Sequence, residues 1–269
     1  MLVDIACNIS STQFKDVDDI ISRSRKASTI PIFVGVDYES SKTCLELAQT
    51  YSTLSFVGLH PTYSQDLHNL HKLFDLHNLH NQHIAAIGEC GLDYLRTEFA
   101  SASLQKKAFE AQLDWKGSHY FLHCRDSHRD FMEMISDYSF SGVVHSFTGS
   151  IEESQELIRR GLWIGINGCS LKDEDGIEMV KSLPVERLLI ETDSPYCKVR
   201  KSYAGYKYIS PRVENKILRK RNEPSCLDQI LEAVSNIKEI DNLEEEIYKN
   251  SINFFGTKLE KIINKFMQN

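Results

Sequence analysis

The sequence predicts an α/β fold, a TIM (β/α)8 barrel followed by carboxyl-terminal helices. Three observations support this prediction. Eight short apolar runs alternate with helical patterns, which is typical of βα units and a parallel sheet. The length of 269 residues is close to the roughly 250 residues of one such barrel. Side chains of metal-ligand type follow the apolar core of five runs, and the carboxyl ends of barrel strands meet on one face.

Each predicted strand is a short run of aliphatic or aromatic residues. The run 84–87 is too short and too β-branched for a helix, and the glycines at 88 and 91 let the backbone approach a neighbour closely. The predicted strands lie at 2–5, 32–36, 56–59, 84–93, 120–122, 142–144, 163–166 and 188–190. A doubly wound open sheet shows the same periodicity and is the alternative fold.

Helical patterns separate most of these strands, and further helices follow the last one. The segment 67–83 holds five of the ten histidines, but its leucines recur every three residues, as on one helix face. We expect those histidines on the exposed side of the third crossover helix, without a metal role. The predicted helices lie near 17–21, 40–51, 67–83, 104–113, 131–135, 152–160, 225–234, 247–255 and 258–267.

Composition limits the function classes. The chain is 41% hydrophobic and 26% charged, as in an ordinary globular protein. No basic and apolar leader stands at the start and no apolar run reaches 18 residues, so we expect an intracellular protein, cytoplasmic or nuclear, without a membrane partner. Seven cysteines without a CxxC pair argue against a disulfide framework and a thiolate zinc site. The net charge of −7 requires any nucleic-acid site to be local.

Five candidate site residues follow strand cores: His60, Glu89, His123, His145 and Asp193. We expect them to converge on the carboxyl face of the barrel. Imidazole and carboxylate without thiolate suit Mg²⁺, Mn²⁺ or Zn²⁺. Two cations would need a bridging carboxylate, for which Glu89 is the candidate. Such a site generates hydroxide near neutral pH and stabilises an in-line displacement at phosphorus.

Candidate substrate contacts lie beside these ligands and in one basic segment. Residues 198–221 carry nine Lys or Arg and one acid, interleaved with Tyr203, Tyr206 and Tyr208. Such a loop could bind phosphates and stack single-stranded bases, or it could be a solvated loop whose tyrosines pack on the barrel. Arg125 could clamp a phosphate or pair with a nearby aspartate, and His128 is either surface or substrate-facing. Arg221 could contact substrate or neutralise a glutamate, 191 or 223.

Eight short motifs follow one another along the chain: Asp4-Ile-Ala-Cys-Asn8, Gly58-Leu-His60-Pro61, Ile87-Gly-Glu89-Cys-Gly-Leu-Asp93, Leu122-His123-Cys-Arg125-Asp126, Val144-His145-Ser-Phe-Thr-Gly149, Ile164-Gly-Ile-Asn-Gly168, Glu191-Thr-Asp193-Ser-Pro-Tyr196 and Arg221-Asn-Glu-Pro224. Together they resemble the TatD family of metal-dependent deoxyribonucleases, within the amidohydrolase-like barrels. The segments 165–171 and 206–209 are most similar to the first subgroup of eukaryotic TatD-domain-containing nucleases.

The resemblance implies one hydrolase domain over residues 1–269, a monomer, and cleavage of DNA phosphodiester bonds, often as a 3′→5′ exonuclease on single strands. It implies catalytic roles for Glu89, Asp193 and His60. The metal ligands would be Glu89, His123, His145 and Asp193, and Asp193 would also help deprotonate the attacking water.

One departure from the family pattern concerns the first strand. Many relatives carry His-x-His where this chain has Ala6 and Asn8. An amide is a poor substitute for imidazole toward transition metals, so the first metal position is weaker or differently filled, and two Mg²⁺ ions are expected instead of tightly held Zn²⁺. Asn8 is a candidate substrate contact. Two rival functions share the barrel: an ester or amide hydrolase such as a D-aminoacyl-tRNA deacylase, and a non-catalytic nucleic-acid binder.

Overall fold

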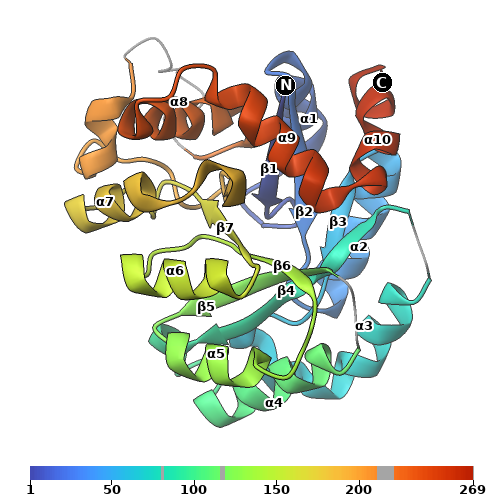
Figure 1. Cartoon of the computed structure of the whole chain (residues 1–269). Helices are drawn as coiled ribbons and strands as arrows, with labels where there is room; N and C mark the ends of the chain where they lie inside the picture. Colours follow the sequence, from blue (N-terminus) through green and yellow to red (C-terminus); the bar gives the residue numbers. More distant parts are fainter. Residues whose placement is uncertain (80–81, 116–118, 211–220, 269) are drawn as a thin grey trace.

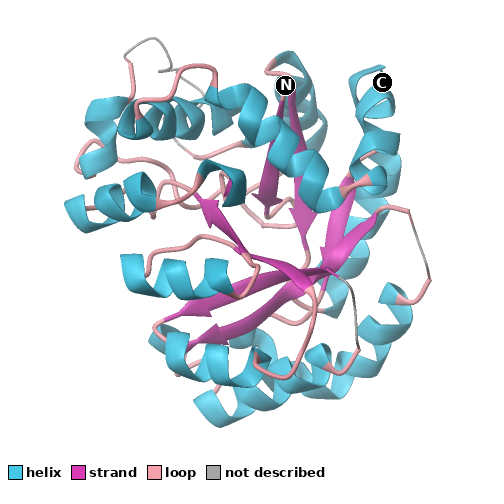
Figure 2. Ribbon diagram, viewed as in Figure 1, coloured by secondary structure: helices cyan, strands magenta, loops and turns pink. Residues whose placement is uncertain are grey.

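The structure, a computed structural model, describes residues 1–79, 82–115, 119–210 and 221–268. Its eight strands are parallel and form one sheet in the order of the sequence. Figures 1 and 2 show the strands at the centre of the molecule and the helices around them. The strands are β1 (Leu2–Cys7), β2 (Thr29–Val34), β3 (Leu54–Val57), β4 (Ile84–Asp93), β5 (His119–Arg125), β6 (Ser141–Val144), β7 (Trp163–Ile166) and β8 (Leu188–Ile190).

The first strand and the segment after β8 meet, so that the sheet is a nearly closed barrel. Cys7 forms a parallel bridge with Ser194, whose carbonyl accepts a hydrogen bond from the Asn8 backbone N–H at 2.8 Å. The carboxylate of Asp4 accepts from the backbone N–H of Thr192 at 2.7 Å. The predicted barrel is confirmed, and these links exclude the doubly wound open sheet, in which the first and last strands do not meet.

Helices connect successive strands, and their amino ends carry the caps that the sequence provides. The side chain of Asp37 accepts from the Ser40 backbone, and Ser150 and Glu153 form a reciprocal capping box. The helices before β8 are α1 (Val17–Lys26), α2 (Tyr38–Tyr51), α3 (Leu70–His77), α4 (Ala102–Leu113), α5 (His128–Ile135), α6 (Ile151–Arg159) and α7 (Glu174–Ser182). Short 3₁₀ helices are η1 (Pro61–Asn69), η2 (Tyr94–Arg96), η3 (Val185–Arg187), η4 (Ala204–Tyr208) and η7 (Pro224–Cys226).

The predicted carboxyl-terminal helices are present as α8 (Leu227–Lys238), α9 (Leu243–Phe255) and α10 (Thr257–Gln268). The Asn250 side chain donates to the carbonyl of Leu188, the first residue of β8. Lys258 donates to the carbonyl of Ile84, the first residue of β4. Phe254 packs edge-on against Trp163, the first residue of β7. The pair α9–α10 therefore covers the amino ends of the strands and leaves the carboxyl ends to the site.

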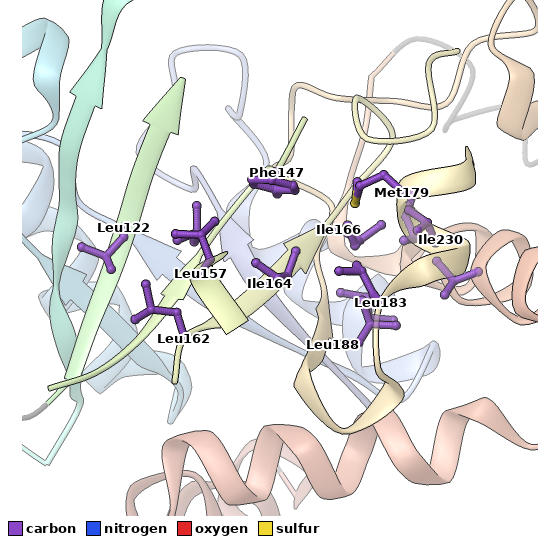
Figure 3. Close-up of a cluster of buried hydrophobic side chains, with 14 of the residues drawn as sticks. Leu122, Phe147, Leu157, Leu162, Ile164, Ile166, Met179, Leu183, Leu188 and Ile230 are labelled. Atoms are coloured by element: carbon purple, nitrogen blue, oxygen red, sulfur yellow. The ribbon is translucent and has the colours of Figure 1, made fainter. Parts of the chain in front are cut away.

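Strand residues that point outward meet the apolar faces of the surrounding helices. Figure 3 shows Ile164, Ile166 and Leu188 packed against Leu157 of α6 and Met179 of α7, all of them buried. Burying a side chain of this size contributes about 1.5–3 kcal/mol. This packing fixes the strands whose ends carry the candidate site residues.

Two predicted elements differ in extent from the structure. β5 continues to Arg125, so His123 lies inside this strand instead of beyond its end, because β4 and β5 stay paired after the register shift between Ile87 and Cys90. The histidine-rich segment forms η1 and the short α3 instead of one helix to residue 83. Its Leu79 is exposed and no longer follows a buried helix face. None of the described helices is long and apolar enough to cross a membrane.

Candidate functional site

Three imidazoles converge on one carboxylate oxygen at the carboxyl face of the barrel. Oε1 of Glu89 lies 2.7 Å from Nε2 of His145, 2.8 Å from Nδ1 of His123 and 3.2 Å from Nε2 of His60. The four side chains come from β4, β5 and the segments after β6 and β3. Glu89, His60 and His145 are buried, and His123 is partly exposed. The structure thus brings together four of the five predicted ligand-type residues.

Each imidazole joins Glu89 to a second polar group. His123 reaches Oδ2 of Asp93 at 3.2 Å through Nε2, and His145 reaches Oε1 of Glu191 at 3.3 Å through Nδ1. Nδ1 of His60 accepts from the backbone N–H of Thr62 at 3.1 Å, which leaves the proton on Nε2 to face Glu89. The second groups fix the orientation of all three rings.

Burial and charge set the protonation of this cluster. Burial opposes the charged form of Glu89, but His145, His60 and His123 outweigh it and hold the pKa of Glu89 well below its usual value. Burial lowers the pKa of His60. For His123 and His145 the neighbouring carboxylates outweigh burial and raise the pKa of both rings. The carboxylates around His123 and His145 therefore favour the protonated form of each ring.

Asp193 stands beside this cluster with its own hydrogen bonds. The Asn8 side chain donates to Oδ1 at 2.8 Å, and the Cys197 thiol donates to Oδ2 at 3.1 Å. Burial, together with the charges of Glu191 and Glu89, raises the pKa of Asp193 to about 6. Within the described residues no hydrogen bond or ion pair links Asp193 to the three imidazoles. A carboxyl group with this pKa can exchange a proton near neutral pH.

Strained backbone gathers in the segments that follow the strands on this face. Asp126, Ser146, Asp193 and Cys197 all have φ between +48° and +52°, a region that side-chain-bearing residues rarely adopt. Such strain persists where the surroundings dictate it, and it clusters at functional sites.

Glycine at 91 allows the close approach of the two strands that carry Glu89 and His123. Gly91 has φ of +142°, and a Cβ there would stand 2.0 Å from the carbonyl oxygen of His123. A side chain at this position would separate the two strands and displace the imidazole from the carboxylate.

Arg125 and His128 line a pocket of about 320 Å³ beside the centre, with Phe147, Ser150 and Glu153 among its other walls. The guanidinium of Arg125 forms no hydrogen bond or ion pair within the residues that the structure describes, so the alternative of a salt bridge to an aspartate is not present. Its charge still helps to lower the pKa of Asp93. His128 instead binds Oε2 of Glu156 through Nε2 at 2.8 Å. Arg125 is therefore the better phosphate ligand of the two.

Arg221 forms an ion pair with Glu223, which is one of the two alternatives that the sequence offered. Its guanidinium binds Asp16 at 2.6 Å and Glu223 at 2.8 Å, and Arg23 binds the same two acids. Because Glu223 is fully buried, it requires this compensation. Of the two glutamates expected as partners, Arg221 therefore pairs with Glu223. The structure shows no bond from Arg221 to Glu191 among the described residues.

The basic segment 198–221 lies only partly within the described residues. Residues 211–220, with four of its cations, lie outside the described residues. Lys207 pairs with Glu174 at 2.9 Å. Tyr203, Tyr206 and Tyr208 are partly buried against the core. This agrees with the alternative in which the tyrosines pack on the barrel. The exposed aromatic rings near the site are elsewhere: Tyr63 is 42% and Tyr196 is 50% exposed.

From the sequence, Asp93 and Glu191 were expected only as possible partners of Arg125 and Arg221. Both contact site imidazoles, and the second oxygen of Glu191 is buried without a hydrogen-bond partner among the described residues. Tyr63 was missed as well, although it follows His60 by three residues and its ring lies edge-on, 6.4 Å from the imidazole. In the sequence, the only indication that Asp93, Glu191 and Tyr63 belong to the site is that each lies within a few residues of a predicted ligand.

Comparisons with known proteins agree with this geometry. The family model described as TatD related DNase matches residues 3–256. The chain belongs to this family. A protein of Vairimorpha ceranae named as a TATDN1 homologue is 52% identical over 268 residues, covering 99% of both chains. A Citrobacter koseri protein named 3′-5′ ssDNA/RNA exonuclease TatD is 35% identical over 247 residues, covering 87% of this chain and 90% of its own.

A solved structure supports the same assignment. A TatD family hydrolase from Entamoeba histolytica superposes with a TM-score of 0.87 at 28% identity, covering 95% of this chain and 98% of its own. The family resemblance and the barrel expected from the sequence are both confirmed.

The donor set of this TatD family chain fits a divalent cation. Ligand atoms of His60, Glu89 and His123 lie within 4.8 Å of one another, all on side chains that are buried or partly so. His145 adds a third imidazole on the same oxygen. Imidazole nitrogen and carboxylate oxygen bind divalent cations. The second oxygen of Glu191 is buried without a hydrogen-bond partner among the described residues, as expected beside a position for a cation.

Proposed function

We propose that the chain is a divalent-metal-dependent deoxyribonuclease that removes nucleotides from the 3′ end of single-stranded DNA. The observation that carries the proposal is the convergence of His60, His123 and His145 on Oε1 of Glu89. It lies at the open face of a barrel whose family is described as TatD related DNase. The bacterial relative named 3′-5′ ssDNA/RNA exonuclease supports the polarity and the single-stranded substrate.

In this scheme Glu89, His123, His145 and Asp193 hold the divalent cations, expected as two ions of Mg²⁺ with Mn²⁺ or Zn²⁺ as alternatives. The chemistry such ions supply is a lowered pKa of bound water and neutralised charge at the phosphate. Asp193 would take the proton of the attacking water.

The remaining residues bind and orient the strand. His60 presents its Nε2 proton at the centre and can donate it in a hydrogen bond to a phosphate oxygen. Arg125 binds a phosphate from the adjoining pocket. Tyr63 and Tyr196 offer exposed rings on which terminal bases can stack, a contact worth about 1–3 kcal/mol per base. Asn8 keeps Asp193 in place through its hydrogen bond.

The test uses single-stranded DNA labelled at either end, EDTA-treated protein, and Mg²⁺, Mn²⁺ or Zn²⁺ added back. We expect metal to restore cleavage and the 5′-labelled strand to shorten stepwise. Glu89→Gln and Asp193→Asn should lose about 10²–10⁴-fold in rate, whereas Glu174→Gln, a matched change at an exposed glutamate, should not.

A folded protein that cleaves no DNA with any of the three metals would contradict the proposal. Release of the amino acid from D-aminoacyl-tRNA under the same conditions would then favour the ester hydrolase. Binding of DNA without cleavage of either substrate would favour the binder.

A further inference from the structure

Two cysteines meet beside Asp193, in the segments that follow β7 and β8. Sγ of Cys169 lies 3.0 Å from Sγ of Cys197, and both side chains are partly exposed. The Cys169 thiol donates to Cys197, and the Cys197 thiol donates to Oδ2 of Asp193 at 3.1 Å. The sulfurs are about 1 Å farther apart than the roughly 2.0 Å of a disulfide bond.

The backbone around the two cysteines is fixed by the fold. A Cβ on Gly168 would stand 2.0 Å from the carbonyl oxygen of Cys197, so the two segments are in direct contact. The side chain of Asn167 accepts a hydrogen bond from the Cys169 backbone N–H at 2.8 Å. The N–H of Gly205 donates to the carbonyl of Leu171 at 2.9 Å and holds the two segments together farther along. Neither cysteine needs a large movement to reach the other.

The other five cysteines lack this arrangement. Cys7, Cys44, Cys90 and Cys226 are buried, and Cys124 is partly exposed with its sulfur 3.6 Å from the hydroxyl of Ser127. Among the described residues, the pair at 169 and 197 is the one in which two thiols lie within bonding reach and face solvent. Exposure and a neighbouring thiol are what reversible oxidation requires.

We propose that Cys169 and Cys197 form a reversible disulfide by exchange with a low-molecular-weight disulfide such as oxidised glutathione. The thiolate of one cysteine attacks a sulfur of the small disulfide, which releases one small thiol and leaves a mixed disulfide. The second cysteine displaces the other small thiol and closes the protein S–S bond. The protein loses two S–H hydrogens, and the small disulfide gains the two electrons and two protons.

The disulfide changes the surroundings of Asp193. Once its sulfur is bonded to Cys169, Cys197 has no S–H to donate, and among the described residues the side chain of Asp193 keeps only the hydrogen bond from Asn8. Loss of an outer partner of a metal-ligating residue typically costs about 10- to 100-fold in metal affinity or activity. This consequence rests on the proposed function, whereas formation of the disulfide does not.

The first measurement is a peptide map of the full-length protein after incubation with oxidised glutathione, with thiols blocked before digestion. Trypsin places Cys169 in peptide 161–172 and Cys197 in peptide 188–198, with no other cysteine in either. We expect these two peptides to be cross-linked and to separate after dithiothreitol. Urea-unfolded protein, treated identically, is the positive control, because oxidation of its exposed cysteines shows that the oxidised glutathione is active. Free thiols or separate glutathione adducts at both positions in the folded protein would overturn the proposal.

The second measurement follows DNA cleavage and the rise in melting temperature on adding Mn²⁺. Both should fall on oxidation, cleavage by about 10- to 100-fold, and recover with dithiothreitol. Cys169→Ala retains Cys197 and its bond to Asp193, so its activity before oxidation should match the wild type. The same reversible loss in Cys169→Ala with an unmodified 188–198 peptide would refute the assignment. A wild-type cross-link that changes neither readout would establish the disulfide and refute its effect on Asp193. A reduced protein without DNase activity would refute the proposed function alone, because the peptide map needs no turnover.

Discussion

Replacing Arg125 by Gln tests whether its guanidinium is a phosphate ligand. Arg125 lines the pocket beside the metal centre and has no hydrogen-bonded partner in the described part of the chain. The change should therefore alter the free energy of unfolding by no more than about 0.5 kcal/mol. A hydrogen bond to a charged group contributes about 1.5–3 kcal/mol, which corresponds to a drop of roughly 10- to 150-fold in kcat/KM for single-stranded DNA.

Salt dependence distinguishes a phosphate contact from a general disturbance. Each phosphate neutralised on a single strand contributes about 0.7 to the slope of log affinity against log salt concentration. We expect the slope for Arg125→Gln, measured by DNA binding in the presence of Ca²⁺ or with Asp193→Asn, to decrease by that amount.

Arg221→Gln is the matched control, because Arg221 is paired with Asp16 and the buried Glu223. It should lower stability by about 1–3 kcal/mol and leave the salt slope of the folded protein unchanged. Wild-type kcat/KM and slope in Arg125→Gln, or a reduced slope in Arg221→Gln, would refute the reasoning.

Two further predictions concern stability. Gly91→Ala should lower the free energy of unfolding in urea by at least ~3 kcal/mol, because the strain of positive φ and a clash with the His123 carbonyl add together. The control is Gly161→Ala, where φ is +88° and the space is open, which should lower it by about 1 kcal/mol. Equal losses in the two variants would contradict this. Burial raises the pKa of Asp4 to about 8, against the hydrogen bonds from Thr192. Since the unfolded value lies near 4, stability from Asp4 is complete below pH 4 and is lost as pH rises toward 8. Asp4→Asn in EDTA should therefore lose less stability than wild type between pH 5 and 8, by at most about 1.4 kcal/mol per pH unit; parallel curves would contradict it.

The sequence by itself was sufficient for the fold class and for the residue types of the site. Runs such as Trp163–Ile166 are apolar throughout and bounded by polar residues, so their strand character is local information. The order of strands in a (β/α)8 barrel follows the chain, so the end of each run marks the functional face. For this reason His60 and His145 could be assigned to a shared site from spacing alone.

Only the tertiary structure decided which side chains meet. The packing of the barrel brings Glu89 of β4 within reach of three imidazoles, one from β5 and two from the segments after β3 and β6. Arg221 is hydrogen-bonded to Asp16, which lies 205 residues away in sequence. Cys169 contacts Cys197 because the two loops that carry them pack together. The hydrophobic periodicity of a segment predicts which of its faces packs against the core. The pairing of polar groups depends on barrel closure and on burial, where an unpaired charge costs several kcal/mol, and those are properties of the whole packed chain.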